Sequence, residues 1–318
     1  MQHLIHSASL KPTEFKRLIG EYPLVHTSPG PALLVSAGVH GNEPSGIAAL
    51  IRVFNQLEMN NIQMKGRIMG VSGNLQALKK GVRLIDQDLN RICTPERAEK
   101  LEKGHPPDFA EEAEFRELLQ IINSLKRDPI YDPLFFMDLH TTSSQTTPYI
   151  SVNKQEKSFS FAKTFPLPVA RGIEQFIPGH FDHYLSLMGH VGFTLEAGQH
   201  TDEKSIDHHV AVIWLALAKA GLLLNPDNEF VEHSRQLLEQ SSHVKKGNYE
   251  VFYRYNIAPG EIFKMEPGFK NFQPIKTGEL LATSDNKPIY SEWDAYIFLP
   301  LYQQQGSDGF FVVKSLDS

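Results

Sequence analysis

The chain has 318 residues, of which 41% are hydrophobic and 21% are charged, and its formal net charge at pH 7 is -6. This length and composition exclude a disordered or fibrous protein and allow one large domain with a smaller one. The net charge, without a cluster of Lys and Arg, argues against a nucleic-acid partner, because phosphates require a basic surface.

Three features bear on the compartment. Cys93 is the single cysteine, so it cannot form an intramolecular disulfide, and a reducing environment suits it. Residues 1–15 lack the basic and apolar segments of a secretion signal. The longest apolar run, 211–224, contains a lysine and is shorter than the roughly 20 residues of a membrane span. We therefore expect a cytoplasmic protein without a membrane segment. No feature of the sequence indicates its oligomeric state.

Apolar runs of strand length alternate with helical patterns along most of the chain, which predicts an α/β fold with a mixed central sheet flanked by helices. The expected strands are 31–40, 66–74, 133–141, 147–152 and 192–198, and the expected helices are 44–59, 108–128 and 206–222. After Asn225, short apolar runs are separated by Gly and Pro turns. We therefore expect a larger domain over residues 1–225 and a smaller β-rich domain over 226–318.

The first predicted strand ends in the sequence VSAGVHGNEPSG, which carries His40 and Glu43 on a turn. Functional sites of open α/β sheets lie beyond the carboxyl ends of the strands. Pro44 suits the start of the next helix and keeps Glu43 on the turn. A histidine and a carboxylate at this spacing can bind a divalent metal. The alternative is an ordinary helix N-terminus with an acidic residue near its dipole.

A zinc site of this kind needs a second histidine, and His140 at the end of the strand FFMDLHTT is the first candidate. Asp138 lies on the same face of that strand, where it could orient a ligand or bond to backbone. His180 and His183 form a rival pair in a loop-like stretch. Adjacent histidines at 208 and 209 are expected on a helix surface.

Two further groups of residues can serve hydrolysis. Glu196 lies in the apolar strand GFTLEAG, where it can act as a general base or face solvent from an edge strand. The segment GVRLIDQDLNRI brings together Arg83, Asn90 and Arg91. Arginines bind carboxylates through paired hydrogen bonds, so this segment is a candidate anion site, with a salt-bridged surface loop as the alternative.

The motifs HGNE, DLNR, DLHTT and LEAG follow one another in this order along the chain. They resemble the motifs of the succinylglutamate desuccinylase and aspartoacylase family, relatives of the zinc carboxypeptidases. The motifs span residues 38–198, and the β-rich tail is also similar to the layout of the family. The resemblance implies a zinc carboxypeptidase-like fold for the larger, zinc-hydrolase domain. It also implies one Zn2+ per chain, held by His40, Glu43 and His140.

Further roles are implied residue by residue. Glu196 matches the general base or acid, and Arg83 matches the arginine that polarises the substrate carbonyl. Asn90 and Arg91 match binders of a substrate carboxylate, and Tyr302 lies where the C-terminal domain of the family brings a tyrosine to the site.

The resemblance implies a deacylase that hydrolyses the amide bond of a small anionic N-acyl amino acid such as N-succinylglutamate or N-acetylaspartate. One alternative is a zinc carboxypeptidase, in which the link between Glu43 and Asn90 would be longer. Another is a non-catalytic metal-binding module, which would be expected to have lost a ligand or the base. One family feature is missing, because no arginine lies in the residues 183–195 before Glu196. This absence puts aspartate derivatives in doubt.

Overall fold

The structure, a computed structural model, describes residues 15–25, 28–128, 131–143, 146–241, 246–302 and 307–317. The N-terminal residues 1–14, in which the sequence predicts no secretion signal, lie outside the described residues. The strands are β1 (Leu18–Tyr22), β2 (Gly30–Ala37), β3 (Arg67–Ser72), β4 (Tyr131–Thr142), β5 (Tyr149–Val152), β6 (Val169–Arg171), β7 (Val191–Gln199), β8 (Asn248–Asn256), β9 (Phe263–Met265), β10 (Gln273–Ile275), β11 (Leu280–Ser284), β12 (Lys287–Tyr290), β13 (Ala295–Phe298) and β14 (Asp308–Ser315). The helices are α1 (Ser45–Met59), α2 (Leu75–Lys80), α3 (Pro95–Glu102), α4 (Ala110–Arg127), α5 (Glu156–Ala162), α6 (Phe181–Leu187), α7 (Lys204–Lys219) and α8 (Glu229–Ser241), with short 3-10 helices η3 (Leu89–Arg91) and η4 (Ile173–Gln175).

The central sheet has 11 strands in the order β1-β3-β2-β4-β7-β5-β6-β8-β14-β13-β10. Strand β2 runs parallel to β3 and β4, and β4 runs parallel to β7. Strands β1 and β5 join this parallel group as antiparallel neighbours. The predicted α/β fold with a mixed central sheet is therefore confirmed.

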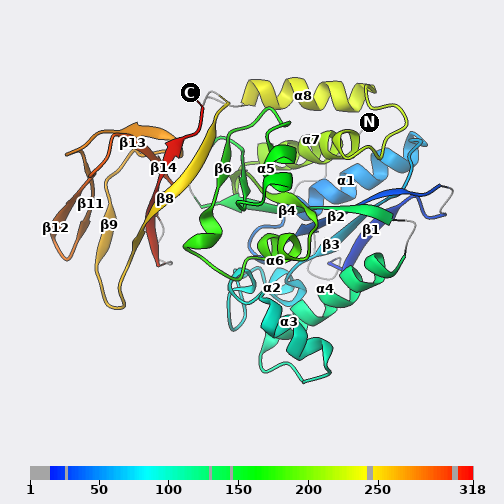
Figure 1. The fold of residues 1–318 in the computed structure, drawn as a ribbon, viewed down its shortest axis with the longest axis horizontal. Helices are drawn as coiled ribbons and strands as arrows, with labels where there is room; N and C mark the ends of the chain where they lie inside the picture. The colour runs from blue at the N-terminus through cyan, green and yellow to red at the C-terminus, as the bar shows by residue number, and fades with distance from the viewer. Residues whose placement is uncertain are drawn as a thin grey trace.

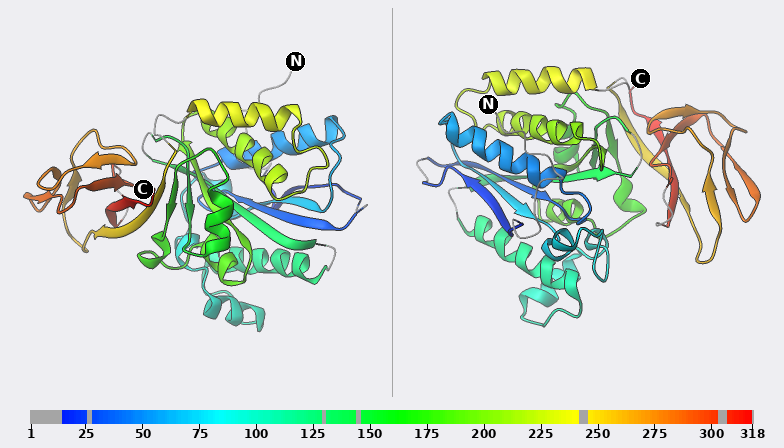
Figure 2. Two further views of the ribbon diagram at one scale, coloured as in Figure 1. Left: turned by 45° about the horizontal axis from the view of Figure 1, so that its top comes forward. Right: turned by 180° about the vertical axis from the view of Figure 1, so that it is seen from behind.

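Helices cover both faces of this sheet, as Figures 1 and 2 show. On one face, α1, α5, α7 and α8 pack in a core that includes Leu33 and Val35 of β2. On the other face, α3, α4 and α6 pack with Ala32 and Leu34 of the same strand. Successive side chains of a strand point to opposite faces, so β2, which is buried on both, contributes to two cores.

Beyond α8, the chain forms the β-rich end of the molecule (Figure 1). Strand β8 pairs with β6 and with β14, so the central sheet continues into this region. Strands β12, β11 and β9 form a separate sheet of 3 strands. Helix α8 lies after residue 225, where the sequence predicts the division between the two domains. It nevertheless packs on α7 of the larger domain, and the centres of the Trp214 and Phe230 rings are stacked 4.6 Å apart. The division remains a prediction, and this packing favours a boundary after Ser241.

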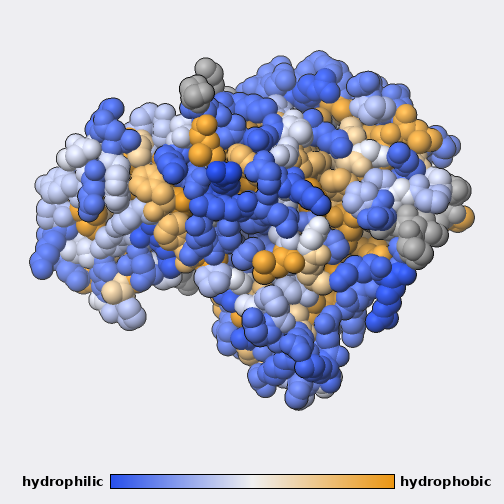
Figure 3. All heavy atoms as spheres, in the orientation of Figure 1, coloured by the Kyte–Doolittle hydropathy of each residue, from blue (hydrophilic) through white to orange (hydrophobic). Residues whose placement is uncertain are grey.

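In the part of the chain that the structure describes, no helix is both long and apolar enough to cross a membrane. The face seen in Figure 3 carries mainly hydrophilic residues, with hydrophobic ones in small separate groups.

Candidate metal centre and active site

His40 and Glu43 lie on the turn between β2 and α1. The amide of Glu43 donates to the carbonyl oxygen of His40 at 3.1 Å, which closes the turn. Gly41 is needed there, because a Cβ atom at this position would lie 2.1 Å from the backbone carbonyl carbon of Ala77. Pro44 then caps α1 with φ -80° and ψ -5°. The turn is thus fixed on both sides of Glu43, in agreement with the sequence analysis.

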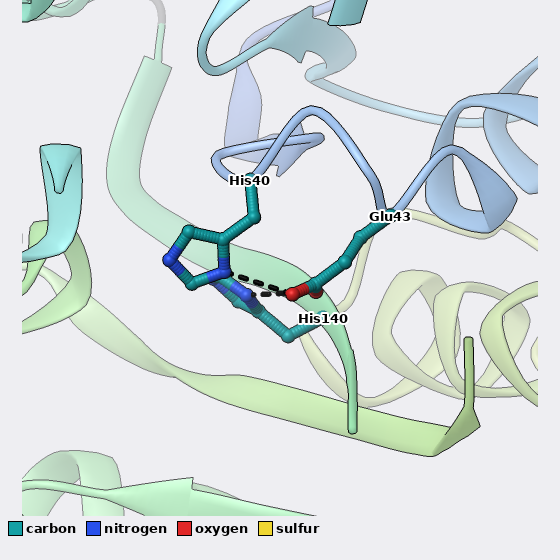
Figure 4. Close-up of side chains that lie close together, drawn as sticks. All are labelled: His40, Glu43 and His140. Atoms are coloured by element: carbon teal, nitrogen blue, oxygen red, sulfur yellow. Dashed lines mark hydrogen bonds and ion pairs between the residues drawn. The ribbon is translucent and has the colours of Figure 1, made fainter. Parts of the chain in front are cut away.

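Strand pairing brings His140 to the same turn. Ala37 at the end of β2 lies opposite Leu139 of β4, so the next residue of β4 reaches the edge where β2 ends. His40 Nδ1 lies 2.9 Å from Glu43 Oε1, and His140 Nδ1 lies 3.2 Å from Glu43 Oε2 (Figure 4). One ligand atom from each of the three residues lies within 4.8 Å of the others. The structure therefore brings together the three residues that the sequence predicts as metal ligands.

An aspartate carboxylate lies next to the Nε2 atom of each of the two histidines, His40 and His140. His40 Nε2 lies 3.1 Å from Asp88 Oδ1, and His140 Nε2 lies 2.8 Å from Asp138 Oδ2. The hydroxyl of Ser36 donates to Asp138 Oδ1 at 2.7 Å, so this carboxylate is itself fixed. Such contacts orient a ligating imidazole and increase its basicity. Of the two roles considered for Asp138, the structure supports ligand orientation.

The electrostatics of the three side chains suit a cation. Burial would raise the pKa of Glu43, but the adjacent His40 and His140 rings outweigh it and hold this pKa well below its usual range. Burial would lower the pKa of His140, but Asp138 and Glu43 outweigh it and raise this pKa well above its usual range. The site thus favours a negative Glu43 with positive charge beside it. Two imidazole nitrogens and a carboxylate oxygen that converge in this way fit a divalent metal.

Arg83 and Asp88 face this centre from the segment between α2 and η3. Arg83 Nη2 lies 3.0 Å from Asp88 Oδ2, and Arg83 Nη1 lies 3.7 Å from Glu43 Oε1. Burial would raise the pKa of Asp88, but its bonds to His40 and the charge of Arg83 hold this pKa well below its usual range. The role of Asp88 was not predicted, although it belongs to the DLNR motif.

Glu111, at the start of α4, holds the same segment in place. Its two carboxylate oxygens accept the backbone amides of Ile85, Asp86 and Gln87, at 2.7 Å for the shortest bond. Its side chain is fully buried. The sequence analysis missed this residue, because a glutamate in the first turn of a helix is common without such a function.

Asn90 and Arg91 lie in η3, beside the metal centre. The side-chain oxygen of Asn90 accepts the amide of Phe181 at 3.0 Å, and its Nδ2 lies 3.2 Å from His140 Nε2. Arg91 Nη1 donates to the carbonyl of Asn90 at 2.9 Å and lies 3.3 Å from His180 Nε2. Asn90 is therefore held by protein groups, whereas Arg91 faces the pocket.

Glu196 stands opposite His140 in the paired strands β4 and β7. Strand β7 lies between β4 and β5, so the alternative of an edge strand is wrong. Glu196 Oε2 is buried and has no hydrogen-bond partner among the described residues. Burial raises the pKa of Glu196 to about 8. A carboxyl oxygen without a hydrogen-bond partner, beside the candidate metal centre, is free to exchange a proton.

Other predicted residues lie away from the centre. The hydroxyl of Tyr302 donates to the carbonyl of Glu266 at 2.8 Å, and the residue is 43% exposed, so the structure does not bring it to the pocket. The expectation that residues 208 and 209 lie on a helix surface is wrong. His208 is 8% exposed and donates from Nδ1 to the carbonyl of Ala197, and His209 is 0% exposed, because α7 packs against β7.

One pocket of about 200 Å³ is lined by the three candidate metal ligands and by the other predicted site residues except Tyr302, namely Arg83, Asn90, Arg91 and Glu196. Its wall also includes Thr141, His200 and Asp308, none of which the sequence analysis singled out. Thr141 donates its backbone amide to Glu43 Oε2 at 2.9 Å, and its hydroxyl lies 2.7 Å from His200 Nδ1. His180, predicted as a rival ligand, lines the pocket beside Arg91 and not in the metal centre.

The sequence matches a family model described as the succinylglutamate desuccinylase/aspartoacylase catalytic domain over residues 29–213. Among curated proteins, the succinylglutamate desuccinylase of Pseudomonas paraeruginosa is 33% identical over 113 residues. These residues make up 35% of this chain and 31% of that relative, so the chain spans about a third of the relative's length in this match.

Solved structures show the same fold over nearly the whole chain. The succinylglutamate desuccinylase/aspartoacylase structure from Rhodobacter sphaeroides has a TM-score of 0.66 at 19% identity and covers 92% of this chain and 87% of that one. Murine aminoacylase 3 has a TM-score of 0.62 at 18% identity and covers 91% of this chain and 97% of that one. The resemblance inferred from the four motifs is confirmed, and the chain belongs to the succinylglutamate desuccinylase/aspartoacylase family.

Proposed function

We propose that the chain is a zinc-dependent deacylase that hydrolyses the amide bond of an N-acyl amino acid. The observation that carries the proposal is the convergence of His40, Glu43 and His140 on one point at the edge of the pocket, next to an unpaired Glu196. The names of the relatives, succinylglutamate desuccinylase and aminoacylase 3, support this class of reaction.

Zinc is the metal that the donor set supports best. Two histidines and a glutamate are a known ligand set of catalytic zinc. Both histidine rings present Nδ1 to the Glu43 carboxylate. The Nε2 atom of each ring lies next to an aspartate carboxylate, which orients the ring. When bound, zinc lowers the pKa of water toward about 7 and polarises a carbonyl group.

Glu196 would move the proton. Its carboxyl group takes a proton from water during attack on the amide carbon and then delivers it to the departing amine. The raised pKa of about 8 suits both transfers near neutral pH, because a general base and acid works best when its pKa lies near the working pH. The products are a carboxylic acid and a free amino acid.

The two arginines would act on different parts of the substrate. Arg83 lies 3.7 Å from Glu43 by its Nη1, so its guanidinium can stabilise negative charge that develops on the carbonyl oxygen. Arg91 can bind the carboxylate of the amino-acid half, as charge-assisted pairs do. Asn90 supports this segment by accepting the amide of Phe181 and lying against His140.

The assay panel includes N-succinylglutamate and N-acetylaspartate, after the names of the family and its curated relatives. We also propose the cytoplasm as the compartment, because the single cysteine, Cys93, is buried and cannot form a disulfide within the chain.

The test separates the proton carrier from the ligands. Glu196→Gln keeps the shape of the side chain and removes its ability to take a proton, so kcat should fall about 100-fold or more while zinc per chain is unchanged. His140→Ala should lose zinc and activity together. Glu239→Gln, an exposed position on α8, is the matched control and should behave as the wild type.

Zinc content is measured by elemental analysis and kcat with a panel of N-acyl amino acids. Near-native zinc in His140→Ala would contradict the metal assignment, and a near-native rate in Glu196→Gln would exclude it as the base. A purified, zinc-loaded wild type that cleaves no member of the panel would contradict the deacylase function.

A further inference from the structure

The pocket already contains a carboxylate of the protein beside the arginine proposed to bind substrate. Asp308, the first residue of β14, lines the pocket, and its Oδ2 lies 3.5 Å from Arg91 Nη2. The other terminal nitrogen of Arg91 contacts the Asn90 carbonyl and His180. The Nη2 atom of Arg91 therefore faces the carboxylate of Asp308, an anion that belongs to the protein itself.

Asp308 is held where it is by a second arginine. Its Oδ1 lies 2.5 Å from Arg254 Nη2, and Arg254 Nη1 donates to the carbonyl of Phe176 at 2.9 Å. Arg254 belongs to β8, which pairs with β14. Movement of this carboxylate would therefore break an ion pair with a side chain that is itself hydrogen-bonded to the backbone.

The described part of the pocket wall offers no unpaired arginine or lysine to a second substrate carboxylate. Among the described residues that line the pocket, the arginines are Arg83 and Arg91, and each faces a carboxylate: Asp88 for the first and Asp308 for the second. His180, which lines the pocket beside Arg91, is kept neutral, because burial and the charge of Arg91 lower its pKa to about 3.

The wall next to this ion pair is apolar. Ile173, Ile177, Phe298 and Phe311 line the pocket and belong to one cluster with Tyr149. Phe311 lies opposite Arg254 in the strand pairing and three positions after Asp308. The side chain of an amino acid is attached to the same carbon as its α-carboxylate, so a substrate bound to Arg91 would place its side chain at this wall.

We infer that Asp308 makes the pocket select N-acyl amino acids with an uncharged, apolar or aromatic side chain and disfavour those with an acidic side chain. This inference rests on the proposed function and deepens it. An acidic side chain of the substrate would lie close to the Asp308 carboxylate, with no unpaired arginine or lysine among the described pocket residues to neutralise it. Like charges at short range repel strongly where water is partly excluded. An apolar side chain would gain by burial against the aromatic wall.

The test uses substrates that differ by one property at a time. N-acetylglutamine and N-acetylglutamate have the same shape and differ in charge, whereas N-acetylleucine and N-acetylglutamine differ in polarity. For the wild type, kcat/KM should decrease from the leucine to the glutamine to the glutamate derivative, with about tenfold or more between the last two. In Asp308→Asn, the ratio between glutamine and glutamate derivatives should shrink about tenfold.

The control is Asp294→Asn, which removes an exposed carboxylate of the same β-rich region and should leave both ratios unchanged. Zinc per chain and thermal unfolding are measured for each variant. A wild type that prefers N-acetylglutamate to N-acetylglutamine would overturn the inference even if Asp308→Asn failed to fold. An unchanged ratio in a folded Asp308→Asn protein would overturn it too. In both cases the deacylase function would stand, whereas cleavage of no substrate would contradict both proposals.

Discussion

At the scale of single residues, the metal centre depends on pairs in which one side chain positions another. His140 alone could rotate about its side-chain bonds, but Asp138 holds its Nε2 and Ser36 holds Asp138. All three residues are buried, so water cannot replace a lost partner. The precision of the centre therefore depends on side chains that need not touch the metal at all.

We expect Asp138→Asn to weaken zinc binding about 10- to 100-fold, because the amide cannot accept a hydrogen bond from the ring as strongly as the carboxylate does. Competition with a chelator of known affinity measures the change. The exposed Asp294→Asn substitution serves as control, and unchanged zinc affinity in Asp138→Asn would show that Asp138 does not support the ligand.

At the scale of elements, the proposed active site is built from the ends of parallel strands and from one segment without regular strand structure. Strands β2, β4 and β7 supply the positions next to the proposed metal centre, and their order follows from the hydrogen bonds of the sheet. The segment that carries Arg83 and Asp88 has no such support. It is fixed by a carboxylate from α4, because Glu111 accepts several of its backbone amides.

Glu111→Gln should disturb this segment, because an amide group would place N–H donors against backbone N–H donors. We expect a loss of about 1 to 3 kcal/mol in the free energy of unfolding, and a decrease in kcat, since Arg83 loses its position. Chemical denaturation measures the first effect and steady-state kinetics the second.

The matched control is Glu117→Gln on the same helix, where the side chain is 53% exposed and pairs only with Arg17 among the contacts described. It should change stability little. If Glu111→Gln lost stability but kept full kcat, Glu111 would be a structural residue without influence on Arg83.

At the scale of the whole molecule, the β-rich end contributes to the wall of the pocket that we propose as the active site. The central sheet continues through β8 into β14, and residues of β13 and β14 line the pocket. Neighbouring residues of β14 point to opposite faces: Phe311 packs in the cluster at the pocket, and Phe310 packs in the cluster with the separate 3-stranded sheet. One strand thus connects the pocket with the end of the molecule.

This alternation allows stability and substrate binding to be separated. Phe310→Leu and Phe311→Leu each remove an aromatic ring from a fully buried site, so each should lower the free energy of unfolding by about 1 to 2 kcal/mol. Only Phe311→Leu should raise KM for N-acetylphenylalanine. Equal KM values for the two variants would contradict a contact between Phe311 and the substrate.

Much of this organisation follows from the sequence alone. Period-two and helical patterns predict the strands and helices around the site, because one face of each element must be buried. Four short motifs, with His40, Glu43, His140 and Glu196, predict the family and the chemistry, because ligands and a proton carrier need particular side chains at the ends of strands.

Tertiary structure decided the rest. Only folding shows that His209 is buried, that Tyr302 bonds to the carbonyl of Glu266, and that Asp308 approaches Arg91 from 217 positions further along the chain. A local pattern records which face of an element is apolar, but it does not record which element covers that face. The contacts that position the ligands and select the substrate join residues far apart in sequence, so they are determined by the packing of the sheet and not by any short motif.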